Sequence, residues 1–259
     1  MPPMASRPLS ETLGLHRDLR VAAIGGGGKM TLLLSVGVEW AQAGGRPLLL
    51  PTTRIADHAE RGVPGVRTLA LPVPRTAWPP VGFLGGELLV VGRKGEKPGM
   101  LESIHPDEIS PLVEQSKADL VLIKADGSRG RSLKAHDDEE PVVPLDTGLV
   151  VAIAGVDAWG VPLGPEHVHH DSLFGERWGM EPGQRIEDDA FFGPLADPAG
   201  YRARVPAGAR YVVFLNQVDR PMRVAVAQRL AQGLNDRGIA EVVWGDLRRG
   251  EWTLSRRER

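Results

Sequence analysis

The chain has 259 residues, a formal net charge of −2 at pH 7, and 42% hydrophobic residues. A charge this close to zero argues against a nucleic-acid or anionic membrane partner. There is no cysteine, which excludes disulfides, thiolate metal sites and cysteine nucleophiles. The N-terminus lacks a signal-peptide pattern, and no apolar run approaches the ~20 residues of a membrane span, so we expect a cytoplasmic protein.

Seven apolar runs rich in Val, Leu and Ile end in turn or polar residues. They do not alternate strictly between apolar and polar positions, which is typical of strands buried on both faces of a parallel sheet. The predicted strands are 19–24, 46–51, 87–92, 119–126, 147–155, 210–216 and 240–246.

Helical patterns lie between several of these runs, at 29–45, 105–118 and 220–238, with a short helix expected near 165–178. The stretch 55–86 is rich in Pro and Gly and is expected to form loops with one or two short strands. We predict one α/β domain over 1–259, with a mostly parallel sheet, helices on both faces, a P-loop NTPase-like architecture and a small irregular or β-rich elaboration. The ends, 1–14 and 250–259, are expected to be flexible.

The segment AAIGGGGKMTLLL (22–34) joins the first predicted strand to the first helix through four glycines and Lys29. Glycines allow successive N–H groups to converge on an anion, and a helix N-terminus adds partial positive charge. The order strand, glycines, lysine, helix therefore predicts a phosphate-binding loop. It departs from G-x-x-x-x-G-K-[ST], because Met30 follows the lysine and the hydroxyl comes one position later, at Thr31. The alternative is a glycine-rich turn with a solvated lysine.

Asp126 ends the predicted strand 119–126 and is followed by Gly, Ser and several cations. An acid at the carboxyl end of a buried strand is where an α/β nucleotide site holds Mg²⁺, usually through water. Arg129, Arg131 and Lys134 are candidates to neutralise phosphate or another anionic partner. The alternative is an ordinary Asp-Gly-Ser turn.

Asn216 and Asp219 follow the predicted strand 210–216 as N-x-x-D. This spacing resembles the guanine-reading N-K-x-D motif, with Gln217 in place of the lysine. An ordinary loop that starts a helix explains the pattern equally well.

Thr52 and Thr53 follow the second predicted strand and are candidates to face phosphates or a metal, or to serve as turn hydroxyls. His167, His169 and His170, with Asp171, form a cluster that has no defined metal-ligand spacing. We expect these histidines to lie beside a substrate pocket rather than to bind a metal.

With these segments in view, most of the chain, from about residue 10 onward, resembles the YqeC family of selenium-dependent hydroxylase accessory proteins. The glycine loop corresponds to the family's G-A-G-G-K-T-[ST], and the loop after Asp126 to its E-A-D-G-S-[KR]-G-x-x-L-K-A. The matching segments are 25–31, 52–55, 124–135, 140–144, 160–163, 168–169 and 216–219.

The resemblance implies a P-loop-like protein that binds ATP or GTP with Mg²⁺ and assists maturation of selenium-dependent molybdenum hydroxylases or their cofactor. Lys29 and Asp126 are the expected catalytic residues, and Thr31 and Asp126 the expected metal ligands. The expected nucleotide contacts are Gly25, Gly26, Gly27, Gly28, Lys29, Thr31, Thr52, Thr53, Arg129, Arg131, Lys134, Asn216 and Asp219.

Three departures from the family pattern, Met30, Lys124 in place of a glutamate, and Gln217, indicate weak Mg²⁺-dependent hydrolysis. Two alternatives remain open. An ATP-dependent ligase or small-molecule kinase would use the same loop with an acceptor bound near 156–175. A non-catalytic scaffold would carry a vestigial loop.

Overall fold

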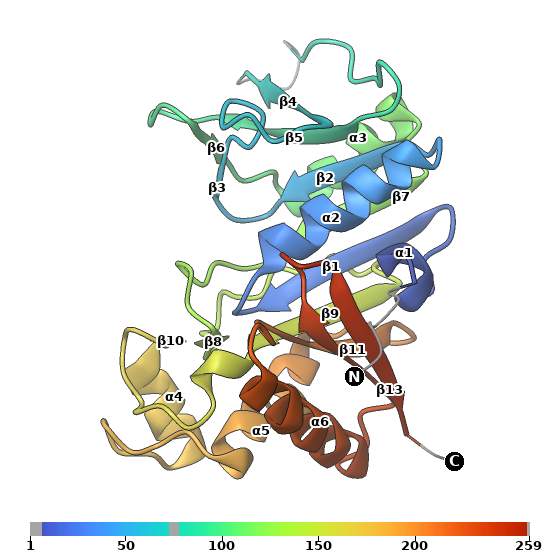
Figure 1. Cartoon of the computed structure of the whole chain (residues 1–259). Helices are drawn as coiled ribbons and strands as arrows, with labels where there is room; N and C mark the ends of the chain where they lie inside the picture. The colour runs from blue at the N-terminus through green and yellow to red at the C-terminus, as the bar shows by residue number, and fades with distance from the viewer. Residues whose placement is uncertain (1–6, 73–77, 258–259) are drawn as a thin grey trace.

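The computed structural model describes residues 7–72 and 78–257 and shows one large, mostly parallel sheet with helices on both faces (Figure 1). The strand order is β13-β12-β11-β9-β1-β7-β2-β5-β6-β3, with β4 paired to β5. The strands from β12 to β2, together with β5 and β4, run parallel, whereas β13, β6 and β3 are antiparallel to their neighbours. Strands β8 and β10 form a separate parallel pair.

All seven predicted strands are present, and the prediction of a mostly parallel α/β sheet is confirmed. The strands are β1 (Leu19–Gly25), β2 (Pro47–Pro51), β3 (Ile55–Ala56), β4 (Val66–Leu71), β5 (Leu88–Lys94), β6 (Met100–Glu102), β7 (Leu120–Lys124), β8 (Leu133–Lys134), β9 (Leu149–Gly155), β10 (Val168–His169), β11 (Arg210–Asn216), β12 (Glu241–Asp246) and β13 (Glu251–Arg256). The helices are α1 (Leu9–Thr12), α2 (Lys29–Gln42), α3 (Pro106–Ser116), α4 (Asp171–Trp178), α5 (Asp188–Ala196) and α6 (Pro221–Asp236).

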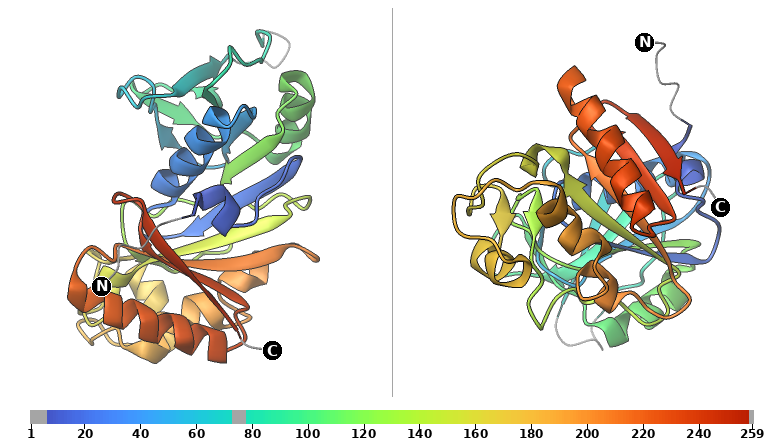
Figure 2. Two further views of the ribbon diagram at one scale, coloured as in Figure 1. Left: turned by 45° about the vertical axis from the view of Figure 1, so that its right-hand side comes forward. Right: turned by 90° about the horizontal axis from the view of Figure 1, so that it is seen from below.

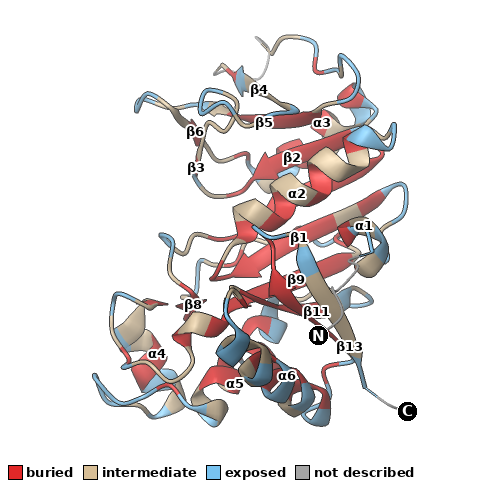
Figure 3. Cartoon of the chain, in the orientation of Figure 1, coloured by how far each residue is buried: buried red, intermediate tan, exposed pale blue. Residues whose placement is uncertain are grey.

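The sheet separates two hydrophobic cores, because alternate residues of each strand face opposite sides. In β1, Ala22 and Ile24 belong to the core that also contains residues of α3, α4, α5 and α6, whereas Val21 and Ala23 belong to the core that contains residues of α1 and α2. The central strands are buried along nearly their whole length (Figure 3). This double burial explains why the strands appear in the sequence as continuous apolar runs.

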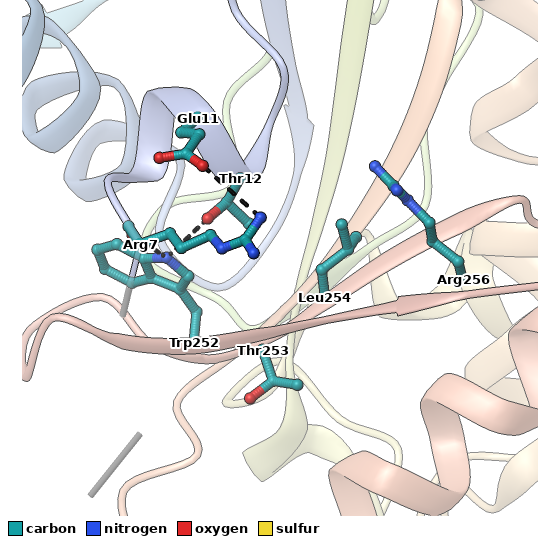
Figure 4. A pocket seen from close by; sticks show the side chains of 7 residues that line it. All are labelled: Arg7, Glu11, Thr12, Trp252, Thr253, Leu254 and Arg256. Atoms are coloured by element: carbon teal, nitrogen blue, oxygen red, sulfur yellow. Dashed lines mark hydrogen bonds and ion pairs between the residues drawn. The ribbon is translucent and has the colours of Figure 1, made fainter. Parts of the chain in front are cut away.

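Helix α1 and strand β13 lie within the terminal segments 1–14 and 250–259, for which the sequence predicts flexibility; residues 1–6 and 258–259 of these segments lie outside the described residues. Strand β13 pairs with β12, and Figure 2 shows it crossing the edge of the sheet beside α6. The indole Nε1 of Trp252 donates to the carbonyl of Arg7 (3.0 Å) and lies 3.2 Å from Thr12 Oγ1 (Figure 4). The backbone N–H groups of Leu9 and Ser10 also donate to the carboxylate of α2 residue Glu39, each at 2.8 Å.

A pocket of about 510 Å³ lies between α1 and β13 (Figure 4), and it is lined by none of the residues predicted for the functional site. Helix α5 is a further element, which the sequence patterns did not predict. None of the helices in the described part of the chain combines the length and apolarity that a membrane span requires.

Candidate functional site

The glycine loop and the loop after β7 meet at the carboxyl edge of the sheet, because β1 and β7 are parallel neighbours. The ammonium of Lys29 lies 2.9 Å from Asp126 Oδ1, and it donates to Ser128 Oγ (3.0 Å) and to the carbonyl of Gly25. Lys29 and Asp126 are 4% and 0% exposed, so this is a fully buried ion pair. The two loops therefore meet at one edge of the sheet, with the lysine held inside the protein.

Three of the four glycines already use their N–H groups within the protein. Gly25 donates to Asp126 Oδ2 (2.7 Å), Gly26 to the carbonyl of Ile153 (2.9 Å), and Gly27 to the carbonyl of Arg131 (2.8 Å). In this conformation these groups are not available to a phosphate. The donors that remain at this end of the loop are the first-turn N–H groups of α2, which has no side-chain N-cap.

Close backbone contacts explain why glycines stand here. A Cβ at Gly26 would lie 2.6 Å from the carbonyl carbon of Ser132. At Gly27, where φ is +76°, it would lie 2.3 Å from the backbone nitrogen of Gly155. Any larger residue would push the loop away from β9 and from the segment after Asp126. The glycine run therefore joins three loops into one packed unit.

A cluster of buried lysines surrounds Asp126, which we call the lysine cluster: Lys29, Lys124 and Lys134 with Asp126, His136 and Glu140. Lys134 pairs with Glu140, and its ammonium donates to the carbonyl of Gly127 at 2.5 Å. His136 Nε2 contacts Asp126 Oδ2. Lys124 contacts Thr53 Oγ1 and lies 3.4 Å from the carbonyl of Arg54, with no carboxylate partner in the described part of the chain.

The pKa values in the lysine cluster reflect burial and mutual repulsion. Burial, and then the nearby Lys29, lower the pKa of Lys124 from 10.5 to about 7, and burial lowers that of Lys134 to about 8. Burial alone would raise the pKa of Asp126, but Lys29, His136 and Lys134 hold it well below its ordinary value. The Asp126 carboxylate is thus ionised at neutral pH, whereas the lowered pKa of Lys124 lies near neutral pH.

On the other side of the glycine loop lies a pocket of about 320 Å³, which we call the α2 pocket. It combines the start of α2 with the residues that follow β9, β11 and β12, at the carboxyl ends of parallel strands, where ligands of α/β sheets gather. The lining residues are Gly27, Gly28, Thr31, Asp157, Asn216, Gln217, Asp219, Arg223, Asp246 and Arg248.

Asn216 joins the glycine loop to the other loops of this pocket. Its Nδ2 donates to the carbonyl of Gly27 (2.6 Å), and its Oδ1 accepts from the backbone N–H of Leu247 (3.0 Å). Asp219, three residues later, lies 2.7 Å from the guanidinium of Arg223. The structure thus brings the N-x-x-D segment to the glycine loop, with Asn216 in a positioning contact and Asp219 on the pocket wall.

Thr31 and Asp126, the residues predicted to bind Mg²⁺, do not line the same pocket. Thr31 lines the α2 pocket, whereas Asp126 does not, and both oxygens of Asp126 already contact Gly25, Lys29 or His136. Met30 packs against the apolar core on the α2 face. These residues as placed do not fit a shared metal site.

Thr52 and Thr53 lie on the side of the lysine cluster. Thr52 Oγ1 lies 3.2 Å from the carbonyl of Lys124, and Thr53 contacts the Lys124 ammonium. Neither lines the α2 pocket. Lys134 is fully buried and paired with Glu140, so it does not face an open cavity.

Arg129, Arg131, His169 and His170 line a third cavity, about 510 Å³, between the 129–135 segment and the start of α4. Within residues 7–72 and 78–257, no three His, Asp or Glu side chains are placed to hold a metal ion. His136, Asp157, Arg223, Asp246 and Arg248 were missed by the sequence analysis. Asp157 and Asp246 lie at or just after the ends of predicted strands, and this position could have identified them as candidate site residues.

Comparisons with known proteins show the family to which this chain belongs. A family model described as YqeC protein matches residues 21–172. This chain belongs to the YqeC family. Over 243 residues it is 29% identical to a protein of Escherichia coli (strain K12) whose name is "Uncharacterized protein YqeC". The aligned region covers 89% of this chain and 88% of that protein. No solved structure matches. The matched region includes the glycine loop and the lysine cluster, whereas Asn216 and Asp219 lie beyond it.

Proposed function

We propose that this YqeC protein binds a nucleotide, ATP or GTP, in the α2 pocket. The observation that carries the proposal is that one pocket joins the uncapped start of α2 to the N-x-x-D segment after β11. These two parts correspond to the two ends of a nucleotide, because the helix start suits phosphate and the Asp219 carboxylate suits the N–H groups of a base. The expected P-loop NTPase-like architecture is part of this proposal.

The phosphate end is assigned to the first turn of α2. The backbone N–H groups of Lys29, Met30 and Thr31 precede the first intrahelical hydrogen bond, which runs from Leu32 to Gly28 (3.0 Å). The Thr31 hydroxyl lines the same pocket and supplies a further donor. The helix dipole adds partial positive charge at this point.

The base end is assigned to Asp219 and Asp157. Asp157 carries a buried Oδ1 that accepts no hydrogen bond from the described part of the chain. A buried acceptor without a partner costs about 1–3 kcal/mol, so a ligand N–H that reaches it gains binding energy. The pocket's volume, about 320 Å³, is within the range of small-molecule sites.

Slow or absent hydrolysis follows from the state of the lysine cluster. Asp126 and Lys29, the expected catalytic pair, neutralise each other in the interior. A protein that holds nucleotide without fast turnover suits the accessory role in hydroxylase maturation that the family resemblance implies, with a molybdenum hydroxylase or its cofactor as partner. A second candidate, phosphoryl transfer by a ligase or kinase, is favoured by the separate cavity lined in part by Pro165 and residues 168–173.

Calorimetric titration of the full chain with ATP and GTP, each with and without Mg²⁺, tests the proposal. Thr31→Ala is expected to weaken binding of both nucleotides about tenfold, because it removes a hydrogen bond to a charged phosphate. Asp219→Asn is expected to weaken the preferred nucleotide selectively if the carboxylate contacts the base.

Asp236→Asn, on an exposed position of α6, is the matched control and should leave binding unchanged. Absence of heat with both nucleotides, or equal affinity in all three variants, would contradict the proposal and favour the scaffold alternative.

A further inference from the structure

The cavity between the 129–135 segment and α4 is built from a defined set of residues, and we call it the arginine pocket: Arg129, Arg131, Pro165, Val168, His169, His170, Asp171, Ser172 and Leu173. Its volume of about 510 Å³ suits a small molecule. It shares no lining residue with the α2 pocket.

The two walls of the arginine pocket are fixed to each other by backbone pairing. Strands β8 and β10 place Lys134 opposite His169, and the N–H groups of Ser132 and Leu133 donate to the carbonyl of His167 at 3.0 and 3.1 Å. Figure 1 shows β8, β10 and α4 side by side at one end of the molecule. The cavity therefore lies in a rigid part of the fold.

The charges in this pocket are unbalanced toward positive. Arg131 donates to the carbonyls of Pro165 and Arg129, and neither Arg129 nor Arg131 forms an ion pair with a carboxylate in the described part of the chain. One carboxylate, Asp171, lines the pocket, and Asp137 lies 3.7 Å from His170 outside the lining. The lining thus contains two arginines and one carboxylate.

The pKa of His169 also reflects the positive charges around this pocket. Burial, and then His170, Lys134, Arg129 and Lys29, lower its pKa to about 4. All four of these charged or titratable neighbours disfavour the imidazolium form, as expected beside several cations. At neutral pH the imidazole is uncharged and can donate or accept a hydrogen bond.

The backbone supports the same conclusion. Arg129 and His170 have φ values of +46° and +58°, a left-handed conformation that is unfavourable for a residue with a side chain. Two of the five non-glycine residues with positive φ in the described part of the chain thus lie on the wall of one pocket, and strained residues often cluster at functional sites.

We propose that the arginine pocket binds the phosphate group of a second ligand, a small phosphate ester distinct from the nucleotide, through Arg129 and Arg131. Guanidinium groups match phosphate geometry with paired N–H donors, and they retain their charge at all physiological pH values. The wall between the two pockets is the 131–132 segment, where Gly27 donates to the carbonyl of Arg131 (2.8 Å) and Ser132 Oγ lies 3.2 Å from Gln217 Oε1. The site does not depend on the nucleotide proposal.

The first experiment is a calorimetric titration of the full chain with inorganic phosphate at neutral pH, at constant ionic strength. Arg129→Gln is the first variant, because the Arg129 side chain makes no hydrogen bond or ion pair with the described part of the chain, so the fold should be unaffected. We expect about tenfold weaker phosphate binding in this variant. Arg61→Gln, an exposed arginine outside both pockets, is the matched control and should bind as the wild type does.

The second readout is the imidazole signal of His169 in nuclear magnetic resonance spectra, assigned with His169→Gln. Bound phosphate should raise the pKa of His169 by about one unit or more, because an anion stabilises the imidazolium form. Sodium chloride at the same ionic strength should not reproduce this rise. An equal rise in Arg129→Gln, or no response to millimolar phosphate, would overturn the proposal.

Two further arms identify the occupant. Asp219→Asn, which alters the α2 pocket, should leave the phosphate response of His169 unchanged. Saturating ATP should also leave phosphate binding intact. If ATP abolishes phosphate binding, the arginine pocket holds the nucleotide's own phosphates and the second-ligand proposal is wrong.

Discussion

The lysine cluster and the α2 pocket lie on opposite sides of the same glycine loop, yet they are organised in contrasting ways. In the lysine cluster, Lys29 and Asp126 are buried and bonded to each other. In the α2 pocket, Asp219 is partly exposed and pairs with Arg223 at the surface. One side of the glycine loop is therefore buried in the interior, and the other side lines a pocket. The contrast shows that most polar groups of a phosphate-loop pattern can be used in hydrogen bonds and ion pairs within the protein.

The largest expected effect comes from removing the buried carboxylate. Asp126→Asn leaves Lys29 buried without its counter-charge, and breaking a buried ion pair costs about 3–5 kcal/mol. Asp219→Asn, in the pocket, breaks a partly exposed pair and should cost less than about 1 kcal/mol. Urea unfolding of both variants measures the difference, and similar free energies of unfolding would remove the distinction between the two regions.

The second effect concerns the shape of the loop. Gly27→Ala should destabilise the protein by about 2–5 kcal/mol, because φ is positive and the new Cβ would overlap the backbone of β9. Gly44→Ala is the matched control, since its φ of +84° is equally unfavourable but no atom lies within 4 Å of the place its methyl group would take. The free energy of unfolding of that control should fall by only about 1–2 kcal/mol. Equal decreases for the two variants in urea unfolding would show that close packing at Gly27 contributes little to stability.

The third effect depends on pH. The folded-state pKa of Lys124 is about 7 against 10.5 for the free side chain. Between these values the unfolded chain binds a proton that the folded chain does not, so the free energy of unfolding rises with pH across this window. Below about pH 7 the charge is carried in both states and the burial cost is fully present.

Lys124→Met removes this cost and should stabilise the protein by about 2 kcal/mol or more near pH 6, with the advantage shrinking toward pH 10. Thermal or urea unfolding over this range is the measurement. In the variant, Lys134, whose pKa is about 8, still causes the free energy of unfolding to rise with pH, by a smaller amount. A constant difference at all pH values would contradict the assignment of the low pKa to Lys124.

The sheet could be predicted from sequence because its strands are buried on both faces, which leaves uninterrupted apolar runs. Strand β13 could not, since its residues Glu251 to Arg256 are mixed in polarity and the arginines before and after it are typical of a solvated end. Helix α1 has only four residues and is held by Glu39 of α2, a contact 29 to 30 residues away in the chain. Both elements depend on tertiary contacts rather than on local pattern.

The candidate site divides in the same way. The loops themselves were visible as residues that follow strands, and parallel neighbours bring such ends together. The sequence could not show that the N–H groups of Gly25, Gly26 and Gly27 donate within the protein. These hydrogen bonds depend on where the Asp126 carboxylate and the carbonyls of β9 and of Arg131 lie in the fold. Likewise, nothing in the local sequence links His136 to Asp126, since the contact requires the chain to turn back after β8.

The chain contains six lysines, and the fold divides them into two equal groups. Lys94, Lys97 and Lys117 are exposed, whereas Lys29, Lys124 and Lys134 are between 0% and 7% exposed. An amine-selective reagent would therefore modify the first group on the folded protein and reach the second only when the centre of the molecule opens. Peptide mapping after such labelling would follow the opening of the lysine cluster directly, with the exposed lysines as an internal standard on the same chain.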